Sequence, residues 1–144
     1  GNIPSPGRNA KLNELPRAKI DGLLDDGLPQ QGRSLRILHK PEVPKLSTVS
    51  KNFQKNFSSH AKNFGISGNW NKANANQFAK ALNSHVQSGG TKHIIGTYRN
   101  TIQVIHHVDP ITGLNVMTTR SGQLISGWKL NPNQLRNVLN RGKL

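Results

Sequence analysis

Cysteine is absent from this 144-residue chain, and acidic residues are scarce, with six Asp and Glu in total. Without cysteine, neither a disulfide framework nor a thiolate zinc site can form. Five of the six acids precede residue 43, so the remainder lacks the paired carboxylates of a glycosidase or of a magnesium-dependent nuclease. We therefore expect any catalysis to proceed without a metal ion or another cofactor.

Long apolar runs are also missing. No stretch approaches the roughly 18 consecutive apolar residues that cross a bilayer, and the N-terminus lacks the apolar core of a signal peptide. We expect no stable membrane insertion. The chain begins with Gly1 rather than Met, as a segment cut from a longer polypeptide would, so we expect a parent protein to carry any export signal.

Positive charge is abundant and unevenly distributed. Lys and Arg number 20, for a formal net charge of +14. Residues 45–144 hold 13 of these bases and one acid, Asp109, a net charge of +12. A domain this basic favours a polyanionic partner, with nucleic acid ahead of an anionic membrane surface or a basic surface without a partner.

Residues 1–44 contain six prolines and one plausible short helix, at residues 18–24. This composition predicts a flexible Pro/Gly-rich linker or arm. A delivery or docking segment is the alternative, which composition alone does not show. The patterned domain is expected at residues 45–144.

A helical pattern follows, with Ser47 or Ser50 as N-cap and Gly65 as the stop signal. Its apolar positions recur at spacings of three and four: Phe53, Phe57, Ala61 and Phe64. His60 therefore lies on or beside the phenylalanine face. Partial burial there suits a proton-transfer residue as well as a core histidine.

The remaining elements complete an α+β fold. Residues 72–87 read as a second helix, and a short helix begins at Pro132. Period-two patterns predict strands at residues 93–98, 101–108, 114–119 and 123–129. We expect N-terminal helices packed on a four-stranded antiparallel meander, followed by the C-terminal helix.

RNA cleavage by the RNA's own 2′-hydroxyl is the chemistry that suits a basic, metal-free protein. It needs a base, and donors that stabilise charge on the phosphate. His60 is the favoured base. His106 and His107 are adjacent in a predicted strand and point to opposite faces, so they cannot readily bind one metal ion together.

The last strand should place Leu124, Ser126 and Trp128 on one face and Ile125 and Lys129 on the other. In that arrangement the Ser126 hydroxyl donates to a phosphate, and Trp128 either stacks on a base or closes the site. Each of these residues also has a plainer interpretation. Trp128 could be a core aromatic residue, Ser126 a small residue tolerated in a strand, and Lys129 an ordinary solvated charge. Tyr98 beside Arg99 either holds RNA by stacking and charge or forms a cross-strand pair.

Two separated motifs resemble the C-terminal nuclease domain of the colicin D family, which recurs as the toxic tip of contact-dependent growth inhibition proteins. The resemblance covers roughly residues 55–132. The motifs are His60-Ala61-Lys62-Asn63-Phe64-Gly65-Ile66-Ser67 and, downstream, Gly96-Thr97-Tyr98-Arg99, Asp109-Pro110, Leu114-Asn115-Val116-Met117 and Leu124-Ile125-Ser126-Gly127-Trp128-Lys129-Leu130-Asn131-Pro132.

The resemblance implies a bacterial toxin that cleaves transfer RNA in the anticodon loop, with arginine isoacceptors suggested by analogy. It implies His60 as catalytic base and Ser126 and Trp128 as active-site residues. It also implies a cognate immunity protein that occupies the site, and we expect that protein to be acidic because the surface it covers is basic. The toxin would be secreted or displayed as part of a larger protein and act in the cytoplasm of the target bacterium.

The family has lysines immediately before its histidine, whereas this chain has Ser58-Ser59. Lys55 and Lys62 do not share a helical face with His60. The cation is therefore sought elsewhere, and the predicted substrate-binding residues are Thr97, Tyr98, Arg99, Lys129 and Lys92. Two alternatives remain open: a non-catalytic basic RNA-binding module, and a metal-dependent DNA nuclease.

Overall fold

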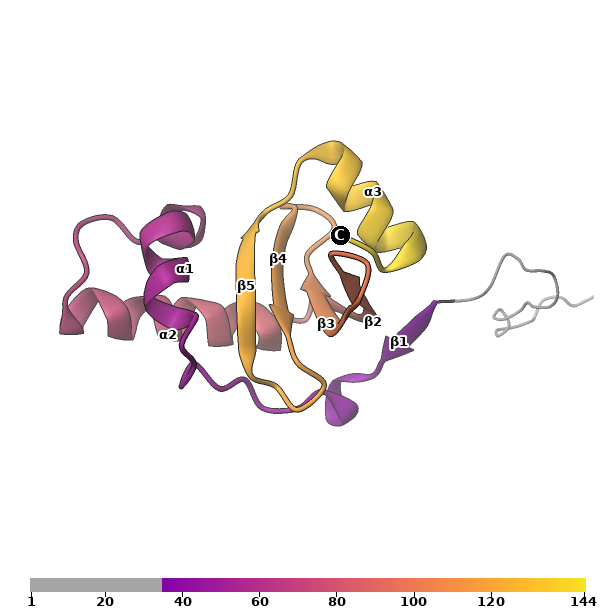
Figure 1. Ribbon diagram of the computed structural model, residues 1–144, viewed down its shortest axis with the longest axis horizontal. Coiled ribbons are helices and arrows are strands. Elements are labelled where there is room, and N and C mark those ends of the chain that lie inside the picture. The colour runs from indigo at the N-terminus through magenta and orange to yellow at the C-terminus, as the bar shows by residue number, and fades with distance from the viewer. Residues whose placement is uncertain (1–34) are drawn as a thin grey trace, which may run out of the picture. The chain divides into compact units, whose positions relative to one another are not determined.

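The computed structural model describes residues 35–144, in which Arg36–Leu144 form one compact unit (Figure 1). The helix expected at residues 18–24 lies outside the described residues. No helix in the described range is long and apolar enough to span a membrane. The elements are β1 (Arg36–Leu38), η2 (Lys40–Glu42), α1 (Phe53–His60), η3 (Ala61–Phe64), α2 (Lys72–Gln87), β2 (Lys92–Tyr98), β3 (Ile102–Val108), β4 (Leu114–Thr118), β5 (Leu124–Lys129) and α3 (Pro132–Arg141).

The α+β class is confirmed, but the sheet has five strands in the order β1-β2-β3-β4-β5 rather than four. Every neighbouring pair is antiparallel. The additional strand, β1, lies in the stretch that we expected to be loosely structured. It has three residues and pairs with the outer edge of β2, so its formation depends on a partner more than 50 residues away.

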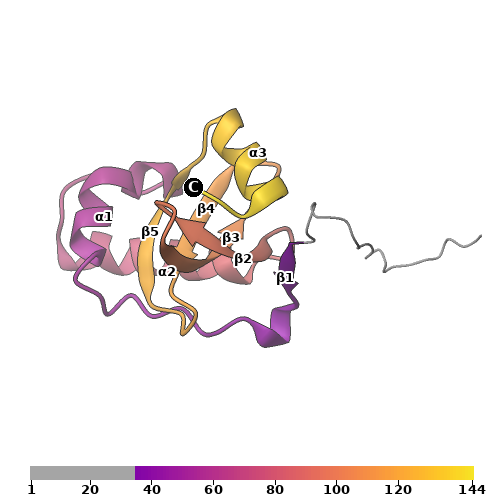
Figure 2. The ribbon, with the colours of Figure 1, turned by 45° about the vertical axis from the view of Figure 1, so that its right-hand side comes forward.

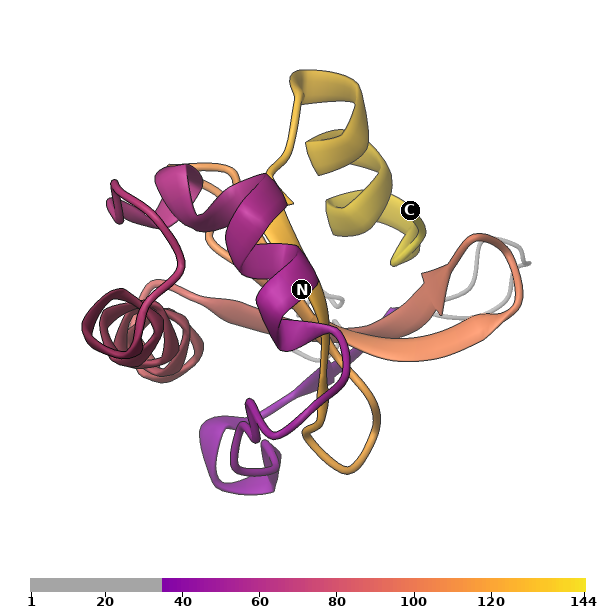
Figure 3. The same cartoon turned by 60° about the vertical axis from the view of Figure 1, so that its left-hand side comes forward.

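The helices lie on both sides of the sheet (Figures 2 and 3). On one side, α2 buries Phe78, Leu82 and Val86 in the main core, together with side chains from α1, β4 and β5. On the other side, α3 buries Val138. Alternation along the strands therefore gives the sheet two apolar faces.

Helix α1 runs along the free edge of β5, and side chains from α1 and from the segments on either side of it bind the backbone of this strand. Asn56 Nδ2 donates to the carbonyl of Ile125 at 2.9 Å, and Asn63 Oδ1 accepts from the Lys129 N–H at 2.9 Å. Ser50 Oγ donates to the Leu124 carbonyl at 3.0 Å. Ser50 is therefore an edge contact and not the N-cap, a position held by Asn52. An exposed sheet edge is closed in this way without another strand.

A β-bulge interrupts β5 beside Thr118, where the register with β4 shifts. Leu124 consequently joins the main core, while Ile125 faces a cleft together with Ser126 and Trp128. The expected alternation, with Leu124 beside Ser126 and Ile125 opposite, was wrong. The bulge adds one residue and thereby reverses the phase of the strand from that point.

The C-terminal segment is fastened to β2 at a very close approach. A Cβ on Gly96 would lie 1.8 Å from the Gly142 carbonyl oxygen, which explains the glycine. The Gly142 oxygen accepts from the Thr97 N–H at 2.8 Å, and the Leu144 oxygen accepts from the Arg99 N–H at 2.9 Å. This holds the β2–β3 turn, where Arg99 has a left-handed φ of 52°.

Three buried histidines form a contiguous group between α2 and the sheet. His107 Nδ1 lies 2.8 Å from His93 Nδ1, and His85 Nε2 lies 2.7 Å from the His107 carbonyl oxygen. Burial lowers the pKa of all three, and the neighbouring histidines help to lower that of His107 to about 3. The charged groups facing them are Lys40, which further lowers the pKa of His93, and Asp109, which opposes the shift of His85.

Acidification should therefore unfold the compact unit Arg36–Leu144. Because the folded-state pKa values lie below the unfolded value of about 6.5, the unfolded chain binds more protons, and stability falls as the pH drops below about 6.5. Each neutral histidine contributes a loss of up to about 1.4 kcal/mol per pH unit. Thermal melts of the full chain between about pH 7.5 and 4.5 should show a steep fall in Tm.

The matched variants are His93→Gln, which should flatten this dependence, and the exposed His39→Gln, which should leave it unchanged. Protonation of carboxylates should contribute little to this pH dependence, because the described residues include just two acidic side chains, Glu42 and Asp109. A Tm that stays constant across this range would contradict the assignment.

Candidate functional site

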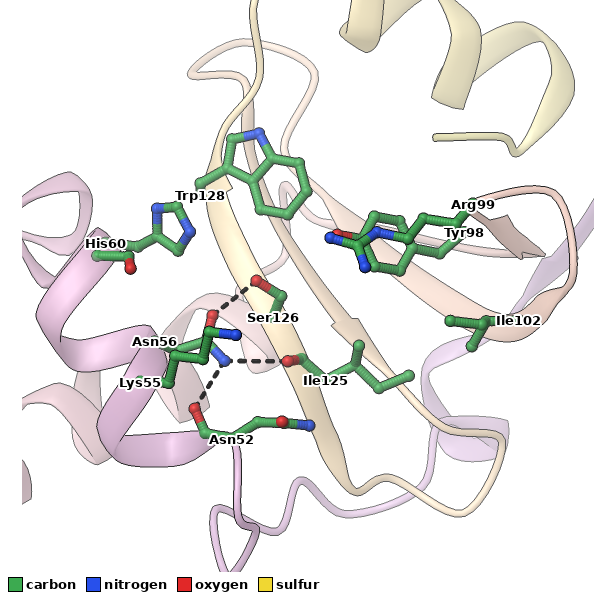
Figure 4. A pocket seen from close by; sticks show the side chains of 11 residues that line it. Asn52, Lys55, Asn56, His60, Tyr98, Arg99, Ile102, Ile125, Ser126 and Trp128 are labelled. Atoms are coloured by element: carbon green, nitrogen blue, oxygen red, sulfur yellow. Dashed lines mark hydrogen bonds between the residues drawn. The ribbon is translucent and has the colours of Figure 1, made fainter.

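A cleft of about 410 Å³ opens between α1 and the sheet, beyond the area that α3 covers (Figure 4). Its lining comes from three parts of the chain: α1 with its N-cap, the β2–β3 hairpin and β5. The residues are Asn52, Lys55, Asn56, Ser59, His60, Tyr98, Arg99, Ile102, Ile125, Ser126 and Trp128. None of them is acidic, so a polyanion would meet no negative side chain in the cleft wall.

His60 lies at the end of α1 with its ring against Trp128. The ring centroids are 5.5 Å apart and the planes differ by 30°, a stacked arrangement. Burial lowers the pKa of His60 from its usual value of 6.5. The imidazole is therefore neutral at neutral pH, as a proton acceptor must be.

Trp128 is held from a second direction. Its indole Nε1 donates to Gln134 Oε1 at 3.4 Å, and the same oxygen accepts from the Asn131 N–H at 3.0 Å. Gln134 belongs to the capping box of α3, so this helix start also fixes the indole. The plane on which His60 rests is thereby supported by α3.

Tyr98 and Arg99 form the facing wall. The Tyr98 ring centroid lies 6.1 Å from that of Trp128, and the Arg99 guanidinium lies 5.0 Å above the Tyr98 ring. A cation stacked on an aromatic ring keeps its charge and its outward N–H donors. This wall offers an aromatic surface and a positive charge to the same ligand.

Ser126 is oriented by a buried amide. Asn56 Nδ2 donates to two carbonyls, those of Asn52 and Ile125, both at 2.9 Å. The amide orientation is therefore fixed, and Asn56 Oδ1 accepts from Ser126 Oγ at 2.6 Å (Figure 4). Because a hydroxyl has one proton, Ser126 offers lone pairs to the cleft. This differs from the expectation that it donates to a phosphate.

Lys55 lines the cleft with His60, although five residues separate them and the sequence pattern placed them on different faces. The positions on this helix that face the cleft follow the spacing 0, 3, 4, 7 and 8, namely Asn52, Lys55, Asn56, Ser59 and His60. Lys55 and His60 bound this arc, about 140° apart. The four-carbon stem of Lys55 lets its ammonium group reach the cleft across that angle. An assignment of helical faces from backbone positions alone does not take this reach into account.

Three of the residues predicted to bind substrate lie elsewhere. Thr97 alternates with Tyr98 on β2 and so points to the opposite face; its backbone binds the C-terminal segment. Lys129 is exposed at the end of β5. Lys92 begins β2, about 20 Å from Tyr98 at the strand's other end. Tyr98 and Arg99 are the two that the structure brings to His60, Ser126 and Trp128.

Six lining residues were not predicted: Asn52, Lys55, Asn56, Ser59, Ile102 and Ile125. The five-residue polar arc of α1 was visible in the sequence, because its spacing is complementary to that of the phenylalanines. Ile125 was hidden by the bulge. Among residues 35–144, no three His, Asp or Glu side chains gather as possible metal ligands.

The basic cleft thus brings together a neutral histidine, stacked aromatic rings and a buried amide. The model of the colicin D family matches residues 52–138, which include every residue that lines the cleft. The chain therefore belongs to the colicin D family.

One solved structure with clear similarity is described as a ribonuclease from Escherichia coli complexed with its inhibitor protein. It is 32% identical, and the alignment covers 64% of this chain and 99% of that one, with a TM-score of 0.57. Among curated proteins, no sequence matches the chain significantly.

Proposed function

We propose that this chain is a ribonuclease toxin that cleaves transfer RNA in the anticodon loop and is neutralised by an acidic immunity protein. Membership of the colicin D family and the likeness to a ribonuclease bound to its inhibitor support the ribonuclease and the inhibitor. The single observation that carries the proposal is the neutral His60 stacked on Trp128 in an acid-free cleft with Ser126.

His60 is the general base in this proposal. Its neutral imidazole removes the proton of a ribose 2′-hydroxyl, whose oxygen attacks the adjacent phosphorus while the bond to the 5′-oxygen breaks. The departing 5′-oxygen takes up a proton from water and His60 later returns its proton to the solvent, so the products are a 2′,3′-cyclic phosphate and a free 5′-hydroxyl. Because DNA has no 2′-hydroxyl, the substrate is RNA. The mechanism needs no metal ion.

Ser126 and Trp128 position the reacting nucleotide. The lone pairs of Ser126 Oγ accept a hydrogen bond from the ribose, since its proton is donated to Asn56. Trp128 keeps the His60 ring in place and presents an aromatic surface. Lys55 and Arg99, from opposite walls, stabilise the charge that gathers on the phosphate oxygens.

Delivery completes the proposed role. The toxin would reach the cytoplasm of a target bacterium as part of a larger secreted or surface-displayed protein, such as a contact-dependent growth inhibition protein. Residues 1–44 would carry or link the nuclease. Arginine isoacceptors are the proposed substrates on the family resemblance alone.

Purified protein should cut total tRNA into half-length fragments in the presence of EDTA. His60→Ala should lower the cleavage rate by about 10²- to 10⁴-fold, because it removes the general base. Denaturing gels measure the fragments, and sequencing their 5′ ends gives both the isoacceptor and the phosphodiester that is cut. His39→Ala, which changes an exposed histidine outside the cleft, is the matched control.

Intact tRNA under these conditions would refute the nuclease. If the protein then bound tRNA without cutting it, the non-catalytic RNA-binding module would be favoured instead. Cleavage of DNA that EDTA abolishes would favour the metal-dependent DNA nuclease.

Lys55→Gln should lower kcat/KM for tRNA by about 10²-fold, the scale seen when one preorganised donor to a developing oxyanion is removed. Arg99→Gln should act in the same direction. Lys92→Gln is the matched control, since Lys92 lies at the far end of β2, and it should change the rate less than about twofold. Equal effects of Lys55→Gln and Lys92→Gln would remove Lys55 from the mechanism.

Asn56→Ala and Ser126→Ala should each slow cleavage, and the double variant should be no slower than the worse single variant. The reason is that Asn56 acts on the reaction through Ser126, so the two changes remove one function. Asn56→Ala also leaves the Ile125 carbonyl without its side-chain donor, whereas the Asn52 carbonyl still accepts from the backbone N–H of residue 56; the expected cost in stability is about 1–3 kcal/mol. Melts should therefore confirm folding at the assay temperature. Losses that multiply in the double variant would show that the two residues act independently.

A further inference from the structure

A second hollow, of about 360 Å³, lies beside the cleft on the other flank of α1. The two share one lining residue, Ser59. Its other polar and aromatic lining includes Ser58, Lys62, Asn69 and Trp70. This volume is within the range of small-molecule sites, and none of its lining residues is acidic.

Trp70 is an unusual feature of this hollow, because 41% of its surface is exposed. Its ring is nevertheless held in a fixed position by edge contacts with Phe53 and Phe57, at centroid distances of 5.8 and 5.3 Å. A large aromatic side chain that is fixed by the core and still open to solvent is suited to stacking with a flat ligand.

The ridge between the two hollows is polar and positive. Lys55 and Ser59 border the cleft, and Ser58, Ser59 and Lys62 border the second hollow. These side chains are exposed. Hydroxyls and ammonium groups in a row, with an aromatic surface beyond them, are the groups with which proteins hold the backbone and bases of a single strand.

We propose that the second hollow is a nucleotide subsite for the same single-stranded RNA whose phosphate lies in the cleft. A base stacks on Trp70, and the connecting phosphate crosses the ridge between Ser59 and Lys62. The inference rests on the proposed function, because it takes RNA as the occupant of the cleft. It gives a role to the Ser58-Ser59 pair that stands where the family resemblance calls for lysine.

RNA binding by the full chain carrying His60→Ala tests the subsite without cleavage. The probe is fluorescently labelled poly(U), and its Kd is measured by anisotropy at one fixed salt concentration. Trp70→Ala should weaken binding by about 5- to 150-fold, the range for loss of one base stack, and Trp70→Phe should retain most of it. Lys62→Gln should weaken binding several-fold and reduce its salt dependence by about one phosphate contact.

Lys80→Gln is the matched control: it removes an exposed lysine of α2 that lines neither hollow, and it should have less than about a twofold effect. The subsite is overturned if Trp70→Ala binds like Trp70→Phe, or if Lys62→Gln behaves like Lys80→Gln. If Trp70→Ala fails to fold, the comparison of Lys62→Gln with Lys80→Gln tests the subsite by itself, because Lys62 is exposed.

The two proposals fail separately. Wild-type protein that does not cut tRNA refutes the nuclease, yet Trp70-dependent binding of poly(U) would still support the subsite. Conversely, wild-type protein that cuts tRNA while Trp70→Ala and Lys62→Gln match it in both Kd and KM leaves the nuclease intact and refutes the subsite alone.

Discussion

The buried amide of Asn56 is the constraint on which the site depends. Its nitrogen binds the backbone of its own helix and that of β5, and its oxygen binds Ser126. The placement of α1, the closure of the sheet edge and the orientation of the Ser126 hydroxyl are therefore set by one group. Because His60 follows one helical turn later, its position relative to Ser126 is fixed by the same contacts.

The aromatic groups supply the second half of the geometry, and they connect the site to distant parts of the chain. Trp128 is held by Gln134 at the start of α3, and the turn that carries Arg99 is held by the Leu144 carbonyl. Substitutions in the last helix or the C-terminal segment would thus affect residues of the cleft, although neither segment lines it. A small domain achieves a rigid wall here because helix, strand and tail converge on it.

Periodicity in the sequence predicted α2, the four longer strands and α3, because each has a strong pattern and clear turn signals. It failed where the structure depends on pairing with a distant strand or on a local bulge. The three residues of β1 pair only because β2 offers an edge, and the bulge beside Ile125 breaks an alternation that was assumed to be unbroken. Lys55 was not predicted to lie near His60 because the helical angle between the two positions was considered without the length of the lysine side chain.

The histidines show why a site cannot be read from residue type. Burial lowers the pKa of His60 and of the core histidines alike. In the core, the neutral imidazoles are occupied with one another and with backbone groups, so the shift acts only on stability. The pKa of His60 is also lowered, but this residue borders an open, acid-free cleft. Access to a ligand, and not the pKa alone, is what makes a buried histidine into a candidate base.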